Sequence, residues 1–161
     1  MDLFGTVVYG GAMETKLFLS DRVEAIHSFE MKNLSADLNE IQREMASWEK
    51  PWRKESLEHY STLGWSFLAE EDGEVLGYVL GQPILFFNNW TQTLWIEHLG
   101  FKTPEVGHEL VDVAIRWART KHLQKVIINS ASDKSSFVME SFKGFKEGSF
   151  LHLSTTKLSE D

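Results

Sequence analysis

The stretch TQTLWIEHLGFKTPEVGHELVDVAIRWARTKHLQKVIINS, residues 91–130, decides the fold of this chain. Its pattern predicts a strand, a tight junction at 101–107, an amphipathic helix and a second strand. A strand, a helix and a strand in one sheet form a right-handed parallel crossover, which places the helix N-terminus at the carboxyl end of the first strand. Because helix N-termini attract anions, the junction at 101–107 is the first candidate for an anion-binding turn.

The helix predicted after this junction has one apolar side and one polar side. The apolar side is spaced to lie on a sheet and carries Leu110, Val111, Val113, Ala114, Ile115, Trp117 and Ala118. The polar side carries Glu109, Asp112, Arg116 and Arg119. Asp112 and Arg116 are one helical turn apart, a spacing that predicts a weak ion pair. The apolar run at 126–128 is typical of a strand buried on both faces.

Residues before position 65 predict a first strand and then short helices. The strand is expected at 15–19, and helical periodicity runs from 22 to about 63 with a break at 33–35. Ser35 or Asp37 is expected to cap the next helix. A third helix is expected over 51–60, and Gly64 ends it.

The periodicity changes from 3.6 to 2 at Trp65, which predicts three antiparallel strands at 65–71, 74–87 and 92–99. Asp72-Gly73 is the strongest hairpin signal in the chain. Glycines and a proline interrupt the second strand, so we expect a bulge or a sheet edge near Gln82-Pro83. After a polar loop at 130–136 and a short helix ending at Gly144, one long strand is expected over 145–158. Its edge offers a surface for a homodimer through sheet pairing.

The composition of the 161 residues excludes several classes of protein. With 42% hydrophobic residues the chain can bury the core of a single domain, which we place at 13–161, with 1–12 as an N-terminal extension. The absence of cysteine excludes disulfides and a thiol nucleophile, and it fits a cytoplasmic protein. The sequence contains no run of about eighteen apolar residues, the length that a membrane-spanning helix needs.

The net charge of −8 disfavours binding to nucleic acid or to an anionic membrane, because both need a basic face. A cationic partner fits this charge better. The six histidines show no metal-binding spacing such as His-Glu-x-x-His, so no metal site is predicted.

The predicted order of elements resembles the GNAT N-acetyltransferase superfamily. The best local matches are DGEVLGYVLG at 72–81, LVDVAIRWARTKHLQKVII at 110–128 and MESFKGFKE at 139–147. The resemblance implies a mixed α/β (α+β) fold, in which helices flank a mostly antiparallel sheet with one parallel pair where two strands splay apart. It also implies that acetyl-CoA binds at this splay and that the acetyl group passes directly to the amine of a small acceptor in a ternary complex.

The same resemblance implies a set of site residues. Cofactor binding falls on Leu99, Gly100, Phe101, Lys102, Thr103, Val106, Gly107, His108 and Ser136. The family's Arg/Gln-x-x-Gly-x-Gly turn aligns with 102–107, where Lys102 replaces the first residue, Glu105 replaces the middle glycine and Gly107 is kept. Glu140 stands where the family often has a tyrosine that protonates the leaving thiolate.

Two interpretations of residues 102–107 remain open. In the first, the residues form an open turn whose backbone N–H groups bind phosphate. In the second, Thr103 is an N-cap, Pro104 is the first helical residue and Glu105 lies in the first turn, so the helix caps itself and begins about four residues early.

Glu97 and His98 are the two candidates for the general base, and Glu97 leads, because a partly buried glutamate has a raised pKa that suits this role. Strict alternation places Trp95, Glu97 and Leu99 on one face of the strand and Leu94, Ile96 and His98 on the other. The structural alternatives are a polar pair at the sheet rim for Glu97 or His98 and an exposed helical residue for Glu140. A second functional hypothesis is a GNAT-like domain that has lost catalysis and serves as a binding or oligomerisation module.

Overall fold

The computed structural model of the chain describes residues 13–86, 89, 91–129, 134–148 and 150–156. The predicted extension at 1–12 lies outside the described residues. The strands are β1 (Met13–Leu17), β2 (Phe67–Glu71), β3 (Glu74–Leu85), β4 (Gln92–Phe101), β5 (Lys125–Asn129), β6 (Phe145–Glu147) and β7 (Phe150–Ser154). The helices are η1 (Ser20–Arg22), α1 (Val23–Met31), α2 (Glu40–Ser47), α3 (Lys54–Ser61), α4 (Pro104–Thr120) and α5 (Ser135–Phe142).

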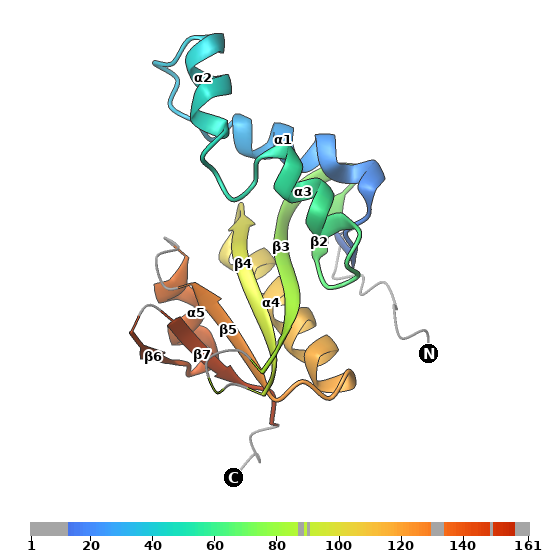
Figure 1. Cartoon of the computed structure of the whole chain (residues 1–161). Helices are drawn as coiled ribbons and strands as arrows, with labels where there is room; N and C mark the ends of the chain where they lie inside the picture. Colours follow the sequence, from blue (N-terminus) through green and yellow to red (C-terminus); the bar gives the residue numbers. More distant parts are fainter. Residues whose placement is uncertain (1–12, 87–88, 90, 130–133, 149, 157–161) are drawn as a thin grey trace.

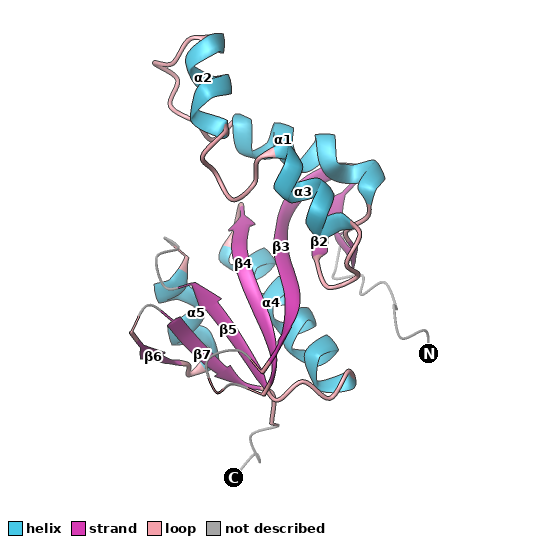
Figure 2. Cartoon of the chain, in the orientation of Figure 1, coloured by secondary structure: helices cyan, strands magenta, loops and turns pink. Residues whose placement is uncertain are grey.

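The strands form one seven-stranded sheet in the order β1-β2-β3-β4-β5-β7-β6 (Figures 1 and 2). All neighbouring pairs are antiparallel except β4 and β5, which α4 connects as a parallel crossover. The predicted mixed fold, with one parallel pair in a mostly antiparallel sheet, is therefore confirmed. No helix within the described residues has both the length and the apolar character needed to cross a membrane.

The sheet separates two hydrophobic cores. On one face α4 and α5 cover strand residues such as Leu94 and Ile96, and α4 contributes Leu110 to this core. On the other face α1 and α3 cover a second cluster that includes Ile26 and Tyr78. A sheet covered on both faces leaves the carboxyl ends of its strands as the place where a cleft can open.

The β2–β3 hairpin and the β6–β7 hairpin both turn on residues with positive φ. Asp72 (φ 49°) and Gly73 (φ 80°) form the predicted two-residue turn. Gly148 (φ 59°) lies between β6 and β7, so the single strand predicted over 145–158 is wrong. A glycine adopts this conformation without steric cost, and the chain reverses there. As a result β7 lies inside the sheet, and the three-residue β6 forms the edge that would be available to a homodimer.

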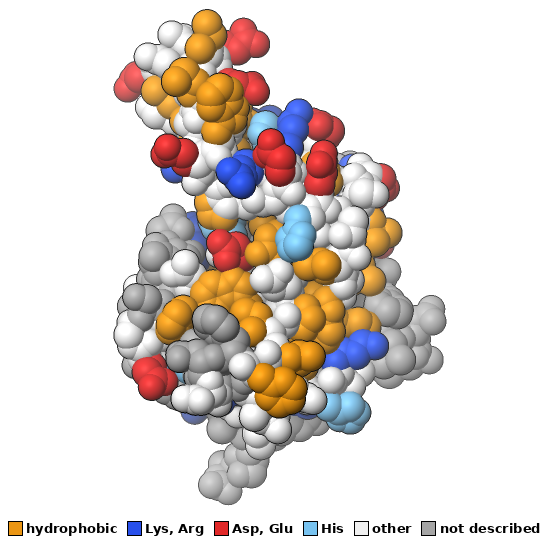
Figure 3. Space-filling view, in the orientation of Figure 1, with side chains coloured by type: hydrophobic (Ala, Val, Ile, Leu, Met, Phe, Trp, Pro, Cys, Tyr) orange, Lys and Arg blue, Asp and Glu red, His pale blue; other side chains and the backbone are white. Residues whose placement is uncertain are grey.

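Helix α2 begins at a different residue from the one predicted. Its N-cap is Asn39, which accepts a hydrogen bond from the Gln42 N–H while the Gln42 side chain accepts from the Asn39 N–H. This reciprocal arrangement satisfies two backbone donors, an advantage that neither predicted cap, Ser35 or Asp37, offers. The apolar stripe of α2 is exposed and gathers at the top of Figure 3: Ile41, Met45 and Trp48.

One residue of α4 lies on the opposite side from its predicted place. Glu109 is only 6% exposed, although the helical pattern placed it on the polar face. Arg116 contacts its carboxylate at 3.5 Å and also pairs with Asp112 at 2.8 Å. The predicted Asp112–Arg116 pair is thus confirmed, and Arg116 serves both carboxylates.

A buried carboxylate ties β2 to β1 and to η1 and makes the stability depend on pH. Glu70 pairs with Lys16, and it accepts a hydrogen bond from Arg22 at 2.6 Å. Burial raises the pKa of Glu70, but the two cations more than offset this, and the net pKa is lowered from 4.5. Because the folded-state pKa is below the unfolded value, this stabilisation is complete above about pH 4.5 and is lost as pH falls below it.

We therefore expect Glu70→Gln to lower the free energy of unfolding at pH 7 by about 1.5 to 3 kcal/mol, the value of hydrogen bonds to a charged group. The variant should also lose less stability than the wild type between pH 5 and pH 3. Urea unfolding at several pH values measures both effects. Glu71→Gln, at the exposed neighbouring position, is the control. An equal acid dependence in wild type and Glu70→Gln would contradict this role.

Candidate active site

Strands β4 and β5 separate at their carboxyl ends. Their parallel pairing runs from Thr93 opposite Lys125 to Ile96 opposite Ile128, while β4 continues beyond this ladder to Phe101. Figure 1 shows the two strands diverging above this point. The splay lies next to the junction that leads into α4, where a ligand would be expected in a sheet of this kind.

A bulge in β4 lies at the start of the splay. Leu80 of β3 pairs with His98 and the next residue, Gly81, pairs with Ile96, so Glu97 is an extra residue in β4. The irregularity predicted near Gln82-Pro83 therefore lies at the adjacent Leu80–Gly81 step of β3, and its extra residue belongs to β4. An extra residue shifts the later side chains by one position relative to the sheet.

This shift changes which residues of β4 share a face. Leu94, Ile96 and Leu99 all belong to the core beneath α4, whereas strict alternation placed Leu99 opposite the other two. Glu97 and His98 in turn both line the same cavity. The predicted alternation is wrong beyond Ile96, and the bulge explains the error.

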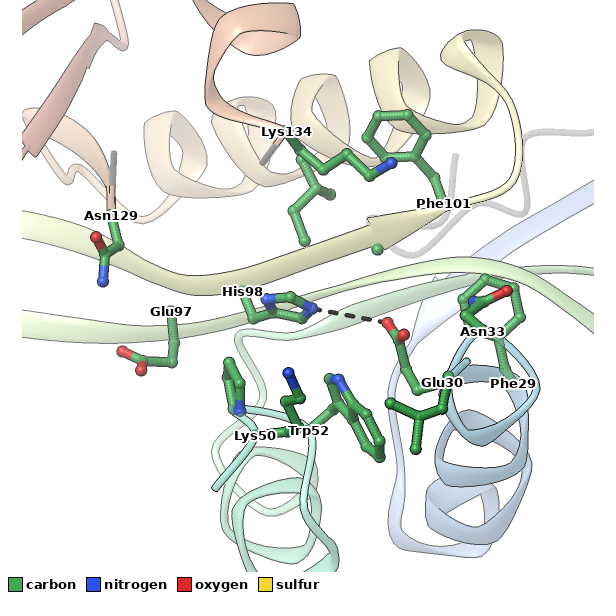
Figure 4. A pocket seen from close by; sticks show the side chains of 14 residues that line it. Phe29, Glu30, Asn33, Lys50, Trp52, Glu97, His98, Phe101, Asn129 and Lys134 are labelled. Carbon is green, nitrogen blue, oxygen red and sulfur yellow. Dashed lines mark ion pairs between the residues drawn. The ribbon is translucent and has the colours of Figure 1, made fainter. Parts of the chain in front are cut away.

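A cavity of about 610 Å³ opens beside the splay (Figure 4). Four parts of the chain form its walls. They are α1 with the segment after it, the segment leading to α3, the carboxyl end of β4, and the carboxyl end of β5 together with the residue before α5. The lining residues are Phe29, Glu30, Asn33, Leu34, Lys50, Pro51, Trp52, Glu97, His98, Leu99, Gly100, Phe101, Asn129 and Lys134. The cavity lining therefore contains negatively charged, positively charged and aromatic side chains.

Glu30 is the centre of a hydrogen-bonded group in this cavity. The Tyr78 hydroxyl donates to Glu30 Oε1 at 2.5 Å, and His98 Nε2 lies 3.6 Å from the same oxygen. The side chains of Glu30 and His98 are 12% and 18% exposed. Burial raises the pKa of Glu30, but the hydrogen bonds with His98 and Tyr78 outweigh burial, and the net pKa is lowered. Glu30 is therefore a carboxylate at neutral pH.

The fully buried Tyr78 stays protonated. Burial raises the pKa of Tyr78 well above its usual value, and the neighbouring Glu30 carboxylate raises it further. A phenol in this state donates its proton to Glu30 in a fixed geometry. Tyr78 thus anchors the carboxylate from the β3 side.

Gly100 allows Glu30 to reach over β4. A Cβ at position 100 would lie 2.5 Å from Glu30 Oε1 and 2.8 Å from Tyr78 Cε1. Both distances are shorter than non-bonded contacts allow. The resemblance assigned Gly100 to cofactor binding, and the structure places it in contact with the carboxylate side of the cavity.

The predicted general base, Glu97, lines the cavity and has its own partner. Trp95 Nε1 donates to Glu97 Oε2 at 2.7 Å. In Figure 4 the Glu97 carboxylate points away from the His98–Glu30 pair. Burial and the charge of Glu97 raise the pKa of Tyr60 to about 12. Glu97 is thus a second negative group in the cavity.

The junction before α4 has the self-capped geometry. Helix α4 begins at Pro104, and the Thr103 side chain accepts a hydrogen bond from the Val106 N–H at 3.5 Å. Glu105 lies exposed in the first turn, and Lys102 pairs with Glu74. Of the two interpretations, the structure shows the helix that begins early.

The remaining predicted site residues lie around α4 and α5. Val106 is buried in the core, and the His108 ring stacks on Phe142 with centroids 4.7 Å apart. Ser136 and Glu140 are exposed on α5. The cavity thus brings together Glu97, Leu99, Gly100 and Phe101 from the predicted set, and the others are not among its lining residues.

Sequence reasoning missed Glu30, Asn129 and Lys134 as parts of the site. Glu30 could have been found, because it follows Val23, Ile26 and Phe29 on the apolar side of α1, where a charged side chain needs a partner. Lys134 Nζ lies 4.8 Å from the centre of the Phe101 ring. Asn129 lies across the splay from β4, and sequence gave no signal for its position.

The chain is similar to one protein family in sequence and to several solved structures in fold. A family model described as the acetyltransferase (GNAT) family matches residues 31–136. Among solved structures, PaiA N-acetyltransferase from Thermoplasma acidophilum, in complex with coenzyme A, has a TM-score of 0.65 at 14% identity, with 89% of this chain and 99% of that chain covered. No curated protein matches the chain significantly.

Two further solved structures have the same fold. Drosophila melanogaster polyamine N-acetyltransferase, which catalyses the formation of N-acetylagmatine, has a TM-score of 0.66 at 11% identity, covering 88% of this chain and 99% of that chain. A GNAT family acetyltransferase from Brucella melitensis, in complex with acetyl-CoA, has a TM-score of 0.61 at 15% identity, covering 92% and 91%. At these identities the similarity shows the fold.

Proposed function

The chain belongs to the acetyltransferase (GNAT) family, and on this premise we propose that it transfers an acetyl or other acyl group from CoA to the amine of a small acceptor. The observation that carries the proposal is the splay of β4 and β5, which opens onto a cavity containing two carboxylates and a histidine. This arrangement supplies room for a ligand between the strands and groups that can accept a proton beside it.

The residues at the splay fit a CoA thioester. Strand β4 continues past its parallel ladder with β5 at Leu99, Gly100 and Phe101. Asn129 and Lys134 face the backbone of these residues from the other side of the splay. Lys134 supplies positive charge that can bind the diphosphate of CoA. The self-capped start of α4 does not itself favour binding of this diphosphate. Acetyl-CoA supplies an acyl carbon that bonds to the amine nitrogen as its bond to sulfur breaks, and the electron pair of that bond leaves on the thiolate.

The cavity suits a cationic acceptor. Glu30 and Glu97 provide negative charge, and Phe29 and Trp52 provide aromatic surface on the α1 and α3 side. Cations bind favourably beside both kinds of group. Amines such as agmatine and polyamines, on which one structural neighbour acts, are the first acceptors to test.

A second candidate function has one observation in its favour. The self-capped start of α4 places Glu105 where the family's turn has a glycine. A carboxylate there opposes a phosphate group at the helix N-terminus. A domain that has lost catalysis and serves as a binding or oligomerisation module remains the alternative, and CoA binding distinguishes the two. Glu97 as a base and Glu140 as the acid for the thiolate also remain predictions.

Acetyl-CoA should stabilise the protein if the proposal is correct. At a concentration 100 times the dissociation constant, binding adds about 2.7 kcal/mol and raises the melting temperature by roughly 5 to 10 °C. Lys134→Ala should weaken CoA binding about tenfold, because a charged contact is lost. Thermal unfolding with and without acetyl-CoA measures the first quantity, and calorimetric titration with CoA measures the second.

Lys121→Ala is the matched control. Lys121 also lies over an aromatic ring, 4.6 Å from the centre of Trp117. Its removal should leave CoA binding unchanged. Absence of binding at millimolar CoA, together with no acetylation of a panel of amines, would reject the enzyme and leave the binding module.

A further inference from the structure

Three side chains from three elements meet at one wall of the cavity. Glu30 comes from α1, Tyr78 from β3 and His98 from β4, and all three contact one another. On the basis of the proposed function, we propose that His98 removes the proton from the acceptor amine and that Glu30 is the positioning residue that holds the His98 ring. In this assignment Glu97 does not take part in proton transfer.

The position of His98 suits a group that contacts the acceptor. It follows the bulge residue Glu97, at the point where β4 leaves β5. Its side chain is mostly buried but reaches the cavity. A base must lie within reach of the amine at the acyl carbon, and His98 is the residue at the splay that has an ionisable ring.

The contact with Glu30 determines which nitrogen of the His98 ring is available to accept the amine proton. Nε2 of His98 faces the Glu30 carboxylate at 3.6 Å, so in the neutral ring Nε2 carries the hydrogen and Nδ1 keeps its lone pair. Nδ1 is then the atom that takes the amine proton. In Figure 4 a dashed line joins one nitrogen of the His98 ring to Glu30, and the other nitrogen lies on the side away from Glu30.

Proton transfer to His98 is favoured by the fixed charge of Glu30. The acceptor ammonium loses one proton to Nδ1, and its nitrogen lone pair becomes free to form the bond to the acyl carbon. As the carbon–sulfur bond breaks, a second proton of that nitrogen passes to the departing thiolate. The resulting imidazolium lies beside a carboxylate whose other partner, Tyr78, is a permanent donor. A carboxylate held in this way stabilises the charged ring and prevents it from rotating.

Three other charged side chains line the same cavity as His98. Glu97 lies on the same strand, Lys50 lies in the segment before α3, and Lys134 lies ahead of α5, all lining the cavity. The Glu97 carboxylate accepts a hydrogen bond from the Trp95 indole and points away from the His98–Glu30 pair. The geometry therefore favours His98 over Glu97.

The test uses the full chain with acetyl-CoA and with agmatine or spermidine as acceptors, over pH 5.5 to 9.5. His98→Gln should lower kcat by a factor of about 10² to 10⁴ and leave CoA binding intact. It should also remove the acidic limb, which is the fall of kcat at low pH in a plot of kcat against pH. Glu30→Gln should lower kcat less, because the ring remains but loses the carboxylate that holds it. Glu97→Gln should keep the limb.

His59→Gln is the control, because His59 is an exposed histidine on α3 that bonds to Gln82. The NMR resonances of the His98 ring give a readout independent of turnover. Glu30→Gln should shift these resonances, because the ring loses the carboxylate beside Nε2. Retention of the rate and of the acidic limb in His98→Gln, loss of the limb in Glu97→Gln, or ring resonances unchanged by Glu30→Gln would each overturn the assignment. A wild type that binds no CoA and acetylates no amine would instead overturn the proposed function, and this inference with it.

Discussion

Leu110→Ala should lower the free energy of unfolding by about 2 to 5 kcal/mol. Leu110 is fully buried on the face of α4 that packs against the sheet, so its removal leaves a cavity between the helix and the strands. The lost transfer free energy and the cavity both contribute to this cost. Guanidinium unfolding followed by circular dichroism measures the change.

Ile41→Ala is the matched control for this prediction. Ile41 lies in helix α2 and is 72% exposed, so the same kind of truncation removes almost no buried area. We expect its effect to stay within about 0.5 kcal/mol. A loss of less than 1 kcal/mol in Leu110→Ala, or an equal loss in both variants, would show that α4 is not the main cover of this core.

Gly100→Ala should lower the turnover of amine acetylation about a hundredfold, the effect of displacing a positioned group by about 1 Å. The added methyl would lie 2.5 Å from Glu30 Oε1 and 2.8 Å from the Tyr78 ring. The Glu30 side chain is the more flexible of the two, so it moves and loses its contact with His98. Steady-state acetylation kinetics measure the change in kcat.

A double-mutant cycle gives the control for Gly100→Ala. In a Glu30→Ala background the carboxylate that the methyl displaces is already absent. Gly100→Ala should then change kcat by less than about threefold, so the two substitutions are far from additive. The same hundredfold loss in both backgrounds would mean that the methyl acts through Tyr78 or the β4 backbone and not through Glu30.

The sequence predicted those parts of the fold that depend on local pattern. The change of period at Trp65, the Asp72-Gly73 turn and the apolar side of α4 each identify an element from neighbouring residues alone. The strand, helix and strand at 91–130 then fix the parallel crossover, because such a connection between parallel strands is almost always right-handed. These features required no knowledge of distant contacts.

The site depends on contacts that periodicity does not contain. The bulge at Glu97 results from the registers of β3 and β4 and reverses the expected face of Leu99. Glu30 precedes His98 by 68 positions in the chain, and the two meet only because α1 crosses the sheet at the end of β4. Side-chain pairing across such a separation is set by tertiary packing, which single-residue patterns do not report.

The start of α4 was left open between two interpretations for a similar reason. Thr103, Pro104 and Glu105 favour a helix start, whereas Lys102 and Gly107 match a phosphate-binding turn. The pairing of Lys102 with Glu74 and the cap made by Thr103 are both satisfied in the self-capped form. Local capping and a long-range ion pair therefore act in the same direction.

The glycine at position 107 is kept for a reason that does not involve a ligand. The Phe101 ring occupies the space next to it, and a Cβ there would lie 2.7 Å from the ring carbons. The size of one residue thus limits the size of the other. Among natural variants of this chain, a side chain at position 107 should appear together with a smaller residue at position 101, so the two positions should covary even in relatives that bind no nucleotide.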